Sequence, residues 1–588
     1  MLSFLSKLFN PCSLLNTIII SLLFRYSSDD NYLKLPKLFH REPQEYDFII
    51  VGAGSAGCVV ANRLSENSEW KVLLLEEGKE EPLITGVPSY TTKLQKSKID
   101  WNYHTQKDEN ACLIGNGCAW PSGKVMGGSS SINIMQYVRG NKEDFNTWAK
   151  LGNPGWSYDD VLSYFIKSEN NKDPDIVNEN PEYHGTKGYL SVERFPYVDP
   201  NSKILYEALQ ELGYKPTDIN AKHQLGTMMI QTTSNNGSRA STNSAFIRPI
   251  RNHRSNLFIK TQVYVTKVLI DSKSKRAIGV EYAHSIHGPT RKVMAKKEVI
   301  LSAGVVQSPK LLMLSGIGPS EQLEKHQINV IKNLSVGHNL HDHVTFVGLI
   351  GNVGKNLTNK PNCLRKIKDL YQYFSKQNGP LASIGVAGVA AFFQTSYEQT
   401  ESTPDIQLVF LAIGDVLTYY EKFVLGPILL TPRSRGFIRL NDTEPIWGNP
   451  IINPRYFDDK MDMKRMIEGV RMSLKLFNTT VLKENGFELD KTPLQPCNKL
   501  EFNSDVYWDC VARQYTQTLY HTVGSCKMGP KEDTEAVVDA KLRVYGIDGL
   551  RVIDASIMPN VPRGNTNAAT IMIGEKGSDM IIQNWTSK

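Results

Sequence analysis

The sequence lacks any dense run of lysine and arginine, although 67 basic against 60 acidic residues give the 588-residue chain a net charge of +7. Because nucleic-acid-binding proteins concentrate such charge, nothing indicates a nucleic-acid partner. Beyond the N-terminal region, the chain also lacks an uncharged apolar run of the about 20 residues that a transmembrane helix needs. The composition, with 40% hydrophobic and 22% charged residues, is typical of globular proteins, and the length favours two closely packed domains.

The N-terminus has the pattern of a targeting segment. Lys7 precedes an apolar run of eleven residues, Leu14–Phe24, and the polar stretch Arg25–Asp30 follows. Such a run is too short to span a bilayer but suits the apolar region of a signal peptide. Residues 1–30 are therefore predicted to be a signal peptide, cleaved or uncleaved, of a secreted or lumenal protein, and no transmembrane anchor is expected.

Eight cysteines are compatible with an oxidising compartment. Cys112 and Cys118 flank the turn-forming segment Gly115-Asn116-Gly117, which could bring them together. Cys497 and Cys510 form a second plausible pair. Sequence alone does not fix disulfide connectivity, so both pairs remain open at this point.

The first strong motif is a glycine-rich turn between an apolar run and a helical pattern. The β-prone run Asp47–Val51 leads directly into Gly52-Ala53-Gly54-Ser55-Ala56-Gly57. A second apolar run, Val72–Leu75, ends at Glu76, which lies 24 residues after Gly52. This order of strand, glycines, helix, strand and acid is typical of dinucleotide-binding folds.

Each part of that motif has a physical task. Gly52 allows the tight turn, Gly54 lets the backbone approach a pyrophosphate, and Gly57 lets the helix lie close to the strand. The helix N-terminus, with Ser55 and Ala56, offers unpaired N–H groups to the phosphates. Glu76 is placed to accept hydrogen bonds from ribose hydroxyls. The motif predicts a dinucleotide but does not separate FAD from NAD.

A second cluster of small residues lies in the segment from Trp120 to Asn133, which reads WPSGKVMGGSSSIN. Dense glycine and serine leave backbone N–H groups free to meet a flat or anionic ligand. Bulky Trp120 and the apolar residues Ile132, Ile134 and Met135 flank the cluster, which favours a buried ligand-contacting segment over a flexible loop.

With this segment, the chain resembles the glucose–methanol–choline oxidoreductase family, especially its arthropod glucose-dehydrogenase-like branch. The resemblance covers roughly residues 45–585. Besides the Trp120 block, it rests on four segments that occur in the family's order: Phe145–Tyr158, Gly304–Pro319, Val336–His343 and Ser434–Gly436. Two departures stand out, since Ser122 replaces the usual arginine and Val305 replaces a small residue. Ser122 puts one polar contact near the cofactor in doubt.

The resemblance implies FAD rather than NAD, an α/β (α+β) fold, and two domains. A Rossmann-type FAD-binding domain would take residues 45–345, completed by 515–588, and a domain of sheet and helices for the substrate would take 346–514. No histidine occurs from Thr105 to Asn133, so we expect non-covalent FAD. By position the resemblance also implies cofactor contacts from Trp101, Val125, Gly128, Ser129, Asn133, Ile134, Met135, Gln136, Val265, Asp554 and Ala555.

The C-terminal quarter supplies the expected catalytic pair. The segment Tyr520–Gly529 resembles the family block that carries a reactive histidine, here His521, and counting back from Ile573-Gly574-Glu575 indicates Asn567 as its partner. An alcohol loses hydride readily only as its hydroxyl proton leaves, and histidine can accept that proton near neutral pH. Asn567 would donate a hydrogen bond to the developing alkoxide. The nearby cluster of His338, His341 and His343 is interpreted as structural, and no metal site is predicted.

The sequence therefore predicts an FAD-dependent oxidoreductase that removes hydride from the CH–OH group of an alcohol or sugar, with oxygen or a quinone as electron acceptor. Two other classes stay open. A hydroxynitrile lyase of the same fold would keep FAD without transferring hydride, and a non-catalytic binding protein would keep only the fold. Substrate identity, the choice between oxidase and dehydrogenase, and the oligomeric state are beyond the motifs.

Overall fold

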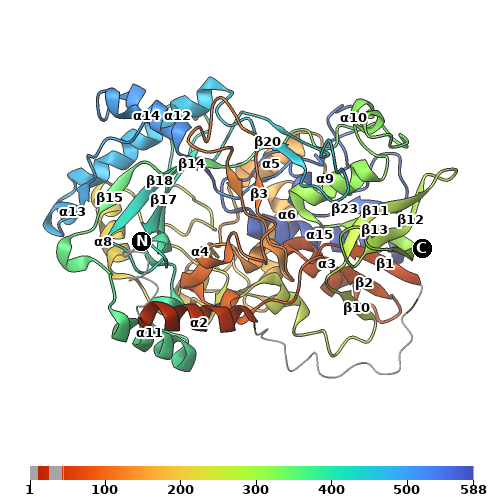
Figure 1. The fold of residues 1–588 in the computed structure, drawn as a ribbon, viewed down its shortest axis with the longest axis horizontal. Coiled ribbons are helices and arrows are strands. Elements are labelled where there is room, and N and C mark those ends of the chain that lie inside the picture. Colours follow the sequence, from red (N-terminus) through yellow and green to blue (C-terminus); the bar gives the residue numbers. More distant parts are fainter. Residues whose placement is uncertain (1–10, 26–42, 44, 587–588) are drawn as a thin grey trace.

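The computed structural model describes residues 11–25, 43 and 45–586, and two β-sheets organise them (Figure 1). The first sheet has seven strands in the order β10-β2-β1-β13-β12-β11, with β23 paired to β13. The pairs β10–β2, β2–β1, β1–β13 and β13–β23 are parallel. The pairs β13–β12 and β12–β11 are antiparallel. The strands are β1 (Glu45–Val51), β2 (Val72–Leu75), β10 (Leu257–Lys260), β11 (Tyr264–Asp271), β12 (Arg276–Ala283), β13 (Thr290–Leu301) and β23 (Leu550–Val552).

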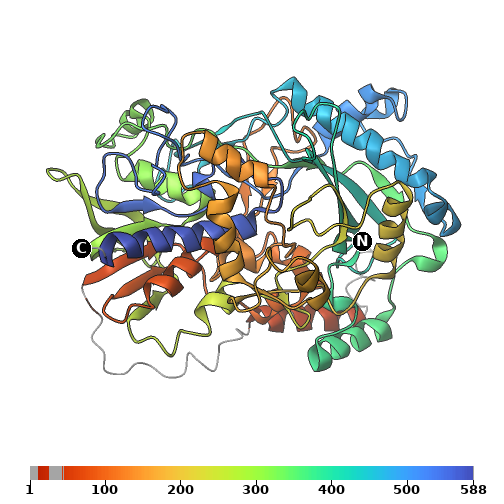
Figure 2. The ribbon, with the colours of Figure 1, turned by 180° about the vertical axis from the view of Figure 1, so that it is seen from behind.

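The ends of the chain meet on this sheet. Helix α3 (Ser55–Leu64) follows β1, and the long C-terminal helix α15 (Thr566–Thr586) packs against it and against α6 (Tyr158–Ser168). Figure 2 shows α15 lying along the sheet. Nearly every residue of α3 is buried, because the apolar face of the helix covers the apolar strands β1 and β2. This packing carries Asn567, in the first turn of α15, to the glycine-rich turn.

The second sheet has eight strands in the order β21-β15-β18-β17-β16-β7, with β14 paired to β18 and β22. Helix α12 (Lys460–Leu474) covers one face, against β17 and β18. The opposite face lines a cavity together with the glycine-rich turn that follows β1. The strands are β7 (Gly226–Met229), β14 (Val344–Phe346), β15 (Ile350–Asn352), β16 (Val389–Phe393), β17 (Ile406–Ile413), β18 (Lys422–Leu429), β21 (Glu488–Leu489) and β22 (Thr516–Thr518).

These sheets match the expected α/β arrangement but move two segments across the predicted domain boundaries. Strand β7 lies within the range 45–345, yet it pairs with β16 of the second sheet. Strand β22 lies within 515–588 and pairs with β14 of the same sheet. Long-range strand pairing, which a linear division of the chain does not contain, places both. The second sheet therefore takes strands from all three predicted segments.

Outside the sheets, both suggested disulfides are formed, between Cys112 and Cys118 and between Cys497 and Cys510. The predicted signal segment 1–30 lies only partly within the described residues, of which 11–25 form helix α2 (Pro11–Arg25). In the described part of the chain, no helix is both long and apolar enough to cross a membrane.

Candidate active site

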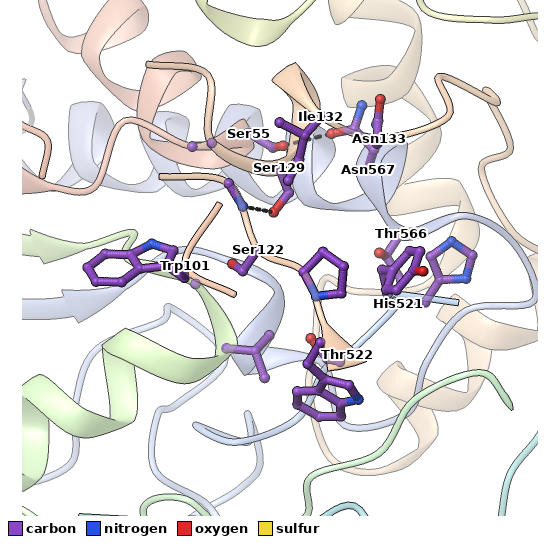
Figure 3. Close-up of a pocket in the computed structure, with 18 of the residues that line it drawn as sticks. Ser55, Trp101, Ser122, Ser129, Ile132, Asn133, His521, Thr522, Thr566 and Asn567 are labelled. Atoms are coloured by element: carbon purple, nitrogen blue, oxygen red, sulfur yellow. Dashed lines mark hydrogen bonds between the residues drawn. The ribbon is translucent and has the colours of Figure 1, made fainter. Parts of the chain in front are cut away.

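A cavity of about 760 Å³ lies between the two sheets, within the range of ligand-binding cavities. At one end it is bounded by the glycine-rich turn after β1 and by Val265 of β11. At the other end it is bounded by His521 and by side chains of β17 and β18. Figure 3 shows Trp101 and His521 on opposite sides of the segment that carries Ser122 and Ser129.

The glycines after β1 have local geometry that fits the tasks expected of them. Gly52 has a φ of +100°, and a Cβ there would lie 2.4 Å from the Ser302 carbonyl oxygen. A Cβ on Gly57 would lie 1.9 Å from the Gly52 carbonyl oxygen, so only glycine lets α3 approach β1 this closely. A Cβ on Gly54 would meet nothing nearer than 4.0 Å. The backbone at the N-terminus of α3 is thus bare toward the cavity, which fits a pyrophosphate.

Glu76 lies at the end of β2, beside the same turn. Its carboxylate accepts hydrogen bonds from the backbone N–H groups of Ala53 (2.9 Å) and Gly78 (2.8 Å). Burial raises the pKa of Glu76 to about 7. Because carboxylate oxygens can accept more than one hydrogen bond, Glu76 can still receive a ribose hydroxyl from the cavity.

The second glycine cluster closes over the first. Gly127 donates its N–H to the Ala53 carbonyl (2.7 Å). A Cβ on Gly128 would lie 2.7 Å from the Gly54 Cα, so the two glycine-rich segments are in direct contact. The Gly123 N–H donates to Ser129 Oγ at 3.1 Å, the contact drawn in Figure 3. Together the two segments form a narrow backbone-lined channel at the cavity's first end.

Most of the predicted cofactor contacts lie on this cavity. Gly57 and Val125 do not line it: Gly57 sets the packing of α3, and Val125 is fully buried in an apolar cluster. The predicted residues that do line it are Gly52, Gly54, Ser55, Ala56, Glu76, Trp101, Gly128, Ser129, Asn133, Ile134, Met135, Gln136, Val265, Asp554 and Ala555.

At the other end, His521 is buried and each of its ring nitrogens has a side-chain partner. Nδ1 lies 2.9 Å from Nδ1 of His343, and Nε2 lies 3.0 Å from Nδ2 of Asn565. The His521 backbone N–H donates to Oδ1 of Asp342 at 2.9 Å. The preceding residue, Tyr520, has a φ of +65°, a strained backbone conformation of the kind found at functional sites.

These contacts determine where the protons of the two histidines lie. Nε2 of His343 lies 3.1 Å from the Leu430 carbonyl, which can only accept, so this nitrogen carries the proton. Burial and His521 hold the pKa of His343 well below its usual value, so Nδ1 of the neutral ring is an acceptor. His521 then donates from Nδ1. Its Nε2 is left with a lone pair at the cavity, beside the N–H of Asn565.

The prediction that Asn567 is the partner of His521 is corrected by this geometry. Oδ1 of Asn567 accepts a hydrogen bond from Ser55 Oγ at 2.7 Å (Figure 3), whereas Asn565 contacts His521. Asn567 belongs to the first turn of α15 and points toward the N-terminus of α3. Asn565 precedes α15, and its carboxamide oxygen has no hydrogen-bond partner. Counting back from Gly574 along the sequence placed the partner two residues too late.

Of the histidines expected to be structural, His341 and His343 have different contacts. His341 does hold backbone, donating from Nδ1 to the Asn339 carbonyl (2.7 Å) and accepting at Nε2 from the Val561 N–H (3.0 Å). His343, however, contacts His521. Within the ranges that the structure describes, no group of three or more histidine, cysteine, aspartate or glutamate residues could hold a metal ion.

Comparison with known proteins decides the family. Two models of the GMC oxidoreductase family match the chain, one over residues 46–345 and one over residues 432–574. The chain belongs to the GMC oxidoreductase family. It is thus an FAD-dependent oxidoreductase acting on CH–OH donors, which confirms the class predicted from the sequence.

Several relatives are similar over almost the whole chain. A glucose dehydrogenase [FAD, quinone] of Drosophila melanogaster is 43% identical, over 94% of this chain and 89% of the relative. An ecdysone oxidase of Bombyx mori is 34% identical, over 92% and 82%. The solved structure of a formate oxidase from Aspergillus oryzae superposes with a TM-score of 0.82 at 26% identity, over 93% of this chain and all of that one.

Proposed function

We propose that this GMC oxidoreductase oxidises a small-molecule alcohol, with His521 accepting the hydroxyl proton and Asn565 holding the hydroxyl oxygen. The observation that carries the proposal is the pair formed by His521 Nε2 and Asn565 Nδ2. They lie 3.0 Å apart on the cavity wall. A substrate hydroxyl that replaces this direct contact could donate to the imidazole lone pair while accepting from the carboxamide N–H.

The chain's own groups supply binding and proton transfer. The turn from Gly52 to Ala56 would hold the FAD pyrophosphate, and Glu76 the adenosine ribose. When bound, FAD supplies the acceptor for the hydride. His521 takes the proton at Nε2, and Asn565 stabilises the negative charge that develops on the oxygen. FAD is proposed to bind non-covalently, because the segment from Thr105 to Asn133 contains no histidine to which it could be attached.

Anaerobic mixing with a panel of alcohols and sugars tests the proposal, with flavin absorbance as the readout. Bleaching by at least one donor is expected. A hydroxynitrile lyase would release cyanide from a cyanohydrin and leave the flavin oxidised, and a binding protein would leave it oxidised with every donor. The base and the carboxamide lie on one cavity, which favours an enzyme over a binding protein. The dehydrogenase and oxidase relatives favour an oxidoreductase over a lyase.

Two further proposals concern the acceptor and the compartment. We propose a quinone as electron acceptor, because the 43% identical Drosophila relative is a glucose dehydrogenase [FAD, quinone]. We propose secretion, supported by the apolar N-terminal run and by the disulfides Cys112–Cys118 and Cys497–Cys510. Re-oxidation of the bleached flavin by a quinone dye in preference to air would support the first.

Replacing His343 is expected to change turnover without removing the base. His343→Leu deprives the His521 Nδ1–H of its acceptor, so more of His521 carries the proton at Nε2 and cannot act as base. We expect kcat to fall about 10- to 100-fold, by analogy with the loss of other residues that orient a functional histidine. His343→Asn, whose Oδ1 can still accept that hydrogen bond, is expected to recover much of the loss. Equal kcat values for the two variants would contradict the positioning role.

The pH dependence follows from the burial of His521, which lowers the pKa of its imidazole to about 3. A base acts in its neutral form, which is populated above its pKa and lost as the pH falls through it. We therefore expect kcat/KM to show no loss attributable to His521 between about pH 8 and pH 5. Stopped-flow flavin reduction across this range is the measurement.

Asp342 could also titrate within this range, because burial raises its pKa to about 7. Its carboxylate accepts a hydrogen bond from the His521 backbone N–H, so the variant Asp342→Asn serves as the control for the pH profile. An inflection near pH 7 that disappears in Asp342→Asn belongs to Asp342. An inflection near pH 6.5 that persists in Asp342→Asn would contradict the low pKa of His521.

A further inference from the structure

The cavity wall beyond His521 indicates the kind of alcohol that the site accepts. Resting on the proposed function, we propose that the substrate is a lipophilic alcohol, with an apolar body behind its hydroxyl group, rather than a polyhydroxylated sugar. The proposal depends on the part of the second sheet, on β17 and β18, that bounds the cavity and carries only apolar side chains there.

That face is apolar on both central strands. Side chains alternate along a strand, so Val409 and Leu411 of β17 face the cavity while Leu408 and Phe410 face the core under α12. On β18, Val424 and Ile428 line the cavity. Gly426, between them, pairs with Val409. The wall formed by Val409, Leu411, Val424 and Ile428 offers no side-chain donor or acceptor, and we call it the apolar wall.

The strand that carries part of the apolar wall reaches the base through His343. Strand β18 ends at Leu429, and the next residue, Leu430, accepts the hydrogen bond from His343 Nε2 that fixes the His343–His521 pair. Leu417 and Leu519 extend the apolar lining around the same end of the cavity. A hydroxyl group held by His521 and Asn565 would therefore have its carbon chain against apolar side chains.

Three polar side chains of the lining, Gln136, Gln517 and Thr91, already have partners within the protein. Gln136 Nε2 donates to the Ala387 carbonyl (2.8 Å), and Gln517 Nε2 donates to Tyr520 Oη (2.7 Å). The Thr91 hydroxyl donates to the Pro88 carbonyl (2.9 Å). A sugar needs a partner for each hydroxyl that it buries, since an unpaired one costs about 1–3 kcal/mol. Against the apolar wall, a sugar hydroxyl would lose its water without gaining a side-chain partner.

A homologous series of primary alcohols tests this. With FAD-loaded protein under anaerobic conditions, kcat/KM for flavin reduction is measured for 1-propanol to 1-octanol and for glucose. Each added CH₂ that is buried against the apolar wall is expected to raise kcat/KM about four-fold, because burying one CH₂ contributes about 0.8 kcal/mol. 1-Octanol is then expected to exceed glucose by at least about 100-fold.

A matched pair of variants ties the effect to the apolar wall. Val424→Thr keeps the shape of the side chain but places a hydroxyl in the wall, and it should lower kcat/KM for 1-octanol about five- to thirty-fold, more than for 1-propanol. Val506→Thr, at an exposed position of α14 (Asp505–Gln514), should change neither value. Equal losses for both alcohols in Val424→Thr would contradict the assignment of the wall.

The outcomes separate the inference from the function on which it rests. Reduction by glucose with a higher kcat/KM than by 1-octanol, or a flat alcohol series, overturns the lipophilic substrate and leaves alcohol oxidation in place. Flavin that no alcohol and no sugar reduces overturns the proposed function, and the inference with it.

Discussion

His521→Ala is expected to retain bound FAD and to reduce that FAD about 10²–10⁴-fold more slowly with an alcohol substrate. The reason is that His521 carries the lone pair that accepts the hydroxyl proton, while its contacts run to His343, Asn565 and Asp342. The glycine-rich segments that would hold the FAD pyrophosphate lie elsewhere in the chain, after β1 and around Gly128. Single-turnover reduction followed at the flavin absorbance band measures the effect.

The matched control is His223→Ala, at an exposed histidine, which should reduce flavin at the wild-type rate. Loss of flavin absorbance in His521→Ala would mean that His521 supports the cofactor site instead. Unchanged reduction in a variant that keeps its flavin would remove His521 from the mechanism.

Asn565→Ala is expected to lower kcat about 100-fold, the typical loss when one donor to a developing oxyanion is removed. Its Nδ2 lies beside the basic nitrogen of His521, so a hydroxyl oxygen placed for proton transfer to the imidazole can also accept from this N–H. Rapid-reaction flavin reduction at saturating alcohol isolates kcat from binding.

Asn567→Ala discriminates between the two asparagines. Asn567 accepts from Ser55, at the first turn of α3, so its loss should weaken FAD retention more than it lowers kcat. If Asn567→Ala instead gave the larger fall in kcat and Asn565→Ala the smaller one, the partner of the base would be Asn567 after all.

The dinucleotide end of the cavity could be predicted from the sequence because its determinants are local. Gly52, Gly54 and Gly57 act through backbone geometry within a single turn, and Glu76 ends the next strand. Local spacing contains all of that information. The disulfides Cys112–Cys118 and Cys497–Cys510 also bridge short separations of 6 and 13 residues.

The chemistry at the other end is assembled from distant segments, and there the sequence was less informative. His343 and His521 lie 178 residues apart, and no local pattern distinguishes a histidine that orients a base from one that holds backbone, as His341 does. The position of Asn565 depends on where α15 begins. The spacing typical of the family indicated the segment that carries the partner of His521. Because α15 begins at Thr566, Asn565 lies before the helix and Asn567 lies in its first turn, and the two side chains have different partners.

The membership of two strands in the second sheet could not be predicted, for a related reason. Strands β7 and β22 are short and lie in segments that otherwise belong to the FAD-binding domain, yet they complete the second sheet. The apolar wall lies on the same sheet, but on β17 and β18, which fall within the predicted substrate range 346–514.

The arrangement at the centre of this account is best tested by an experimental structure of the protein with FAD and a non-reacting alcohol analogue. The account predicts the analogue's oxygen within hydrogen-bonding distance of both His521 Nε2 and Asn565 Nδ2, with its carbon chain against Val424 and Ile428. An isoalloxazine ring remote from His521, or an analogue oxygen bound by other side chains, would contradict it.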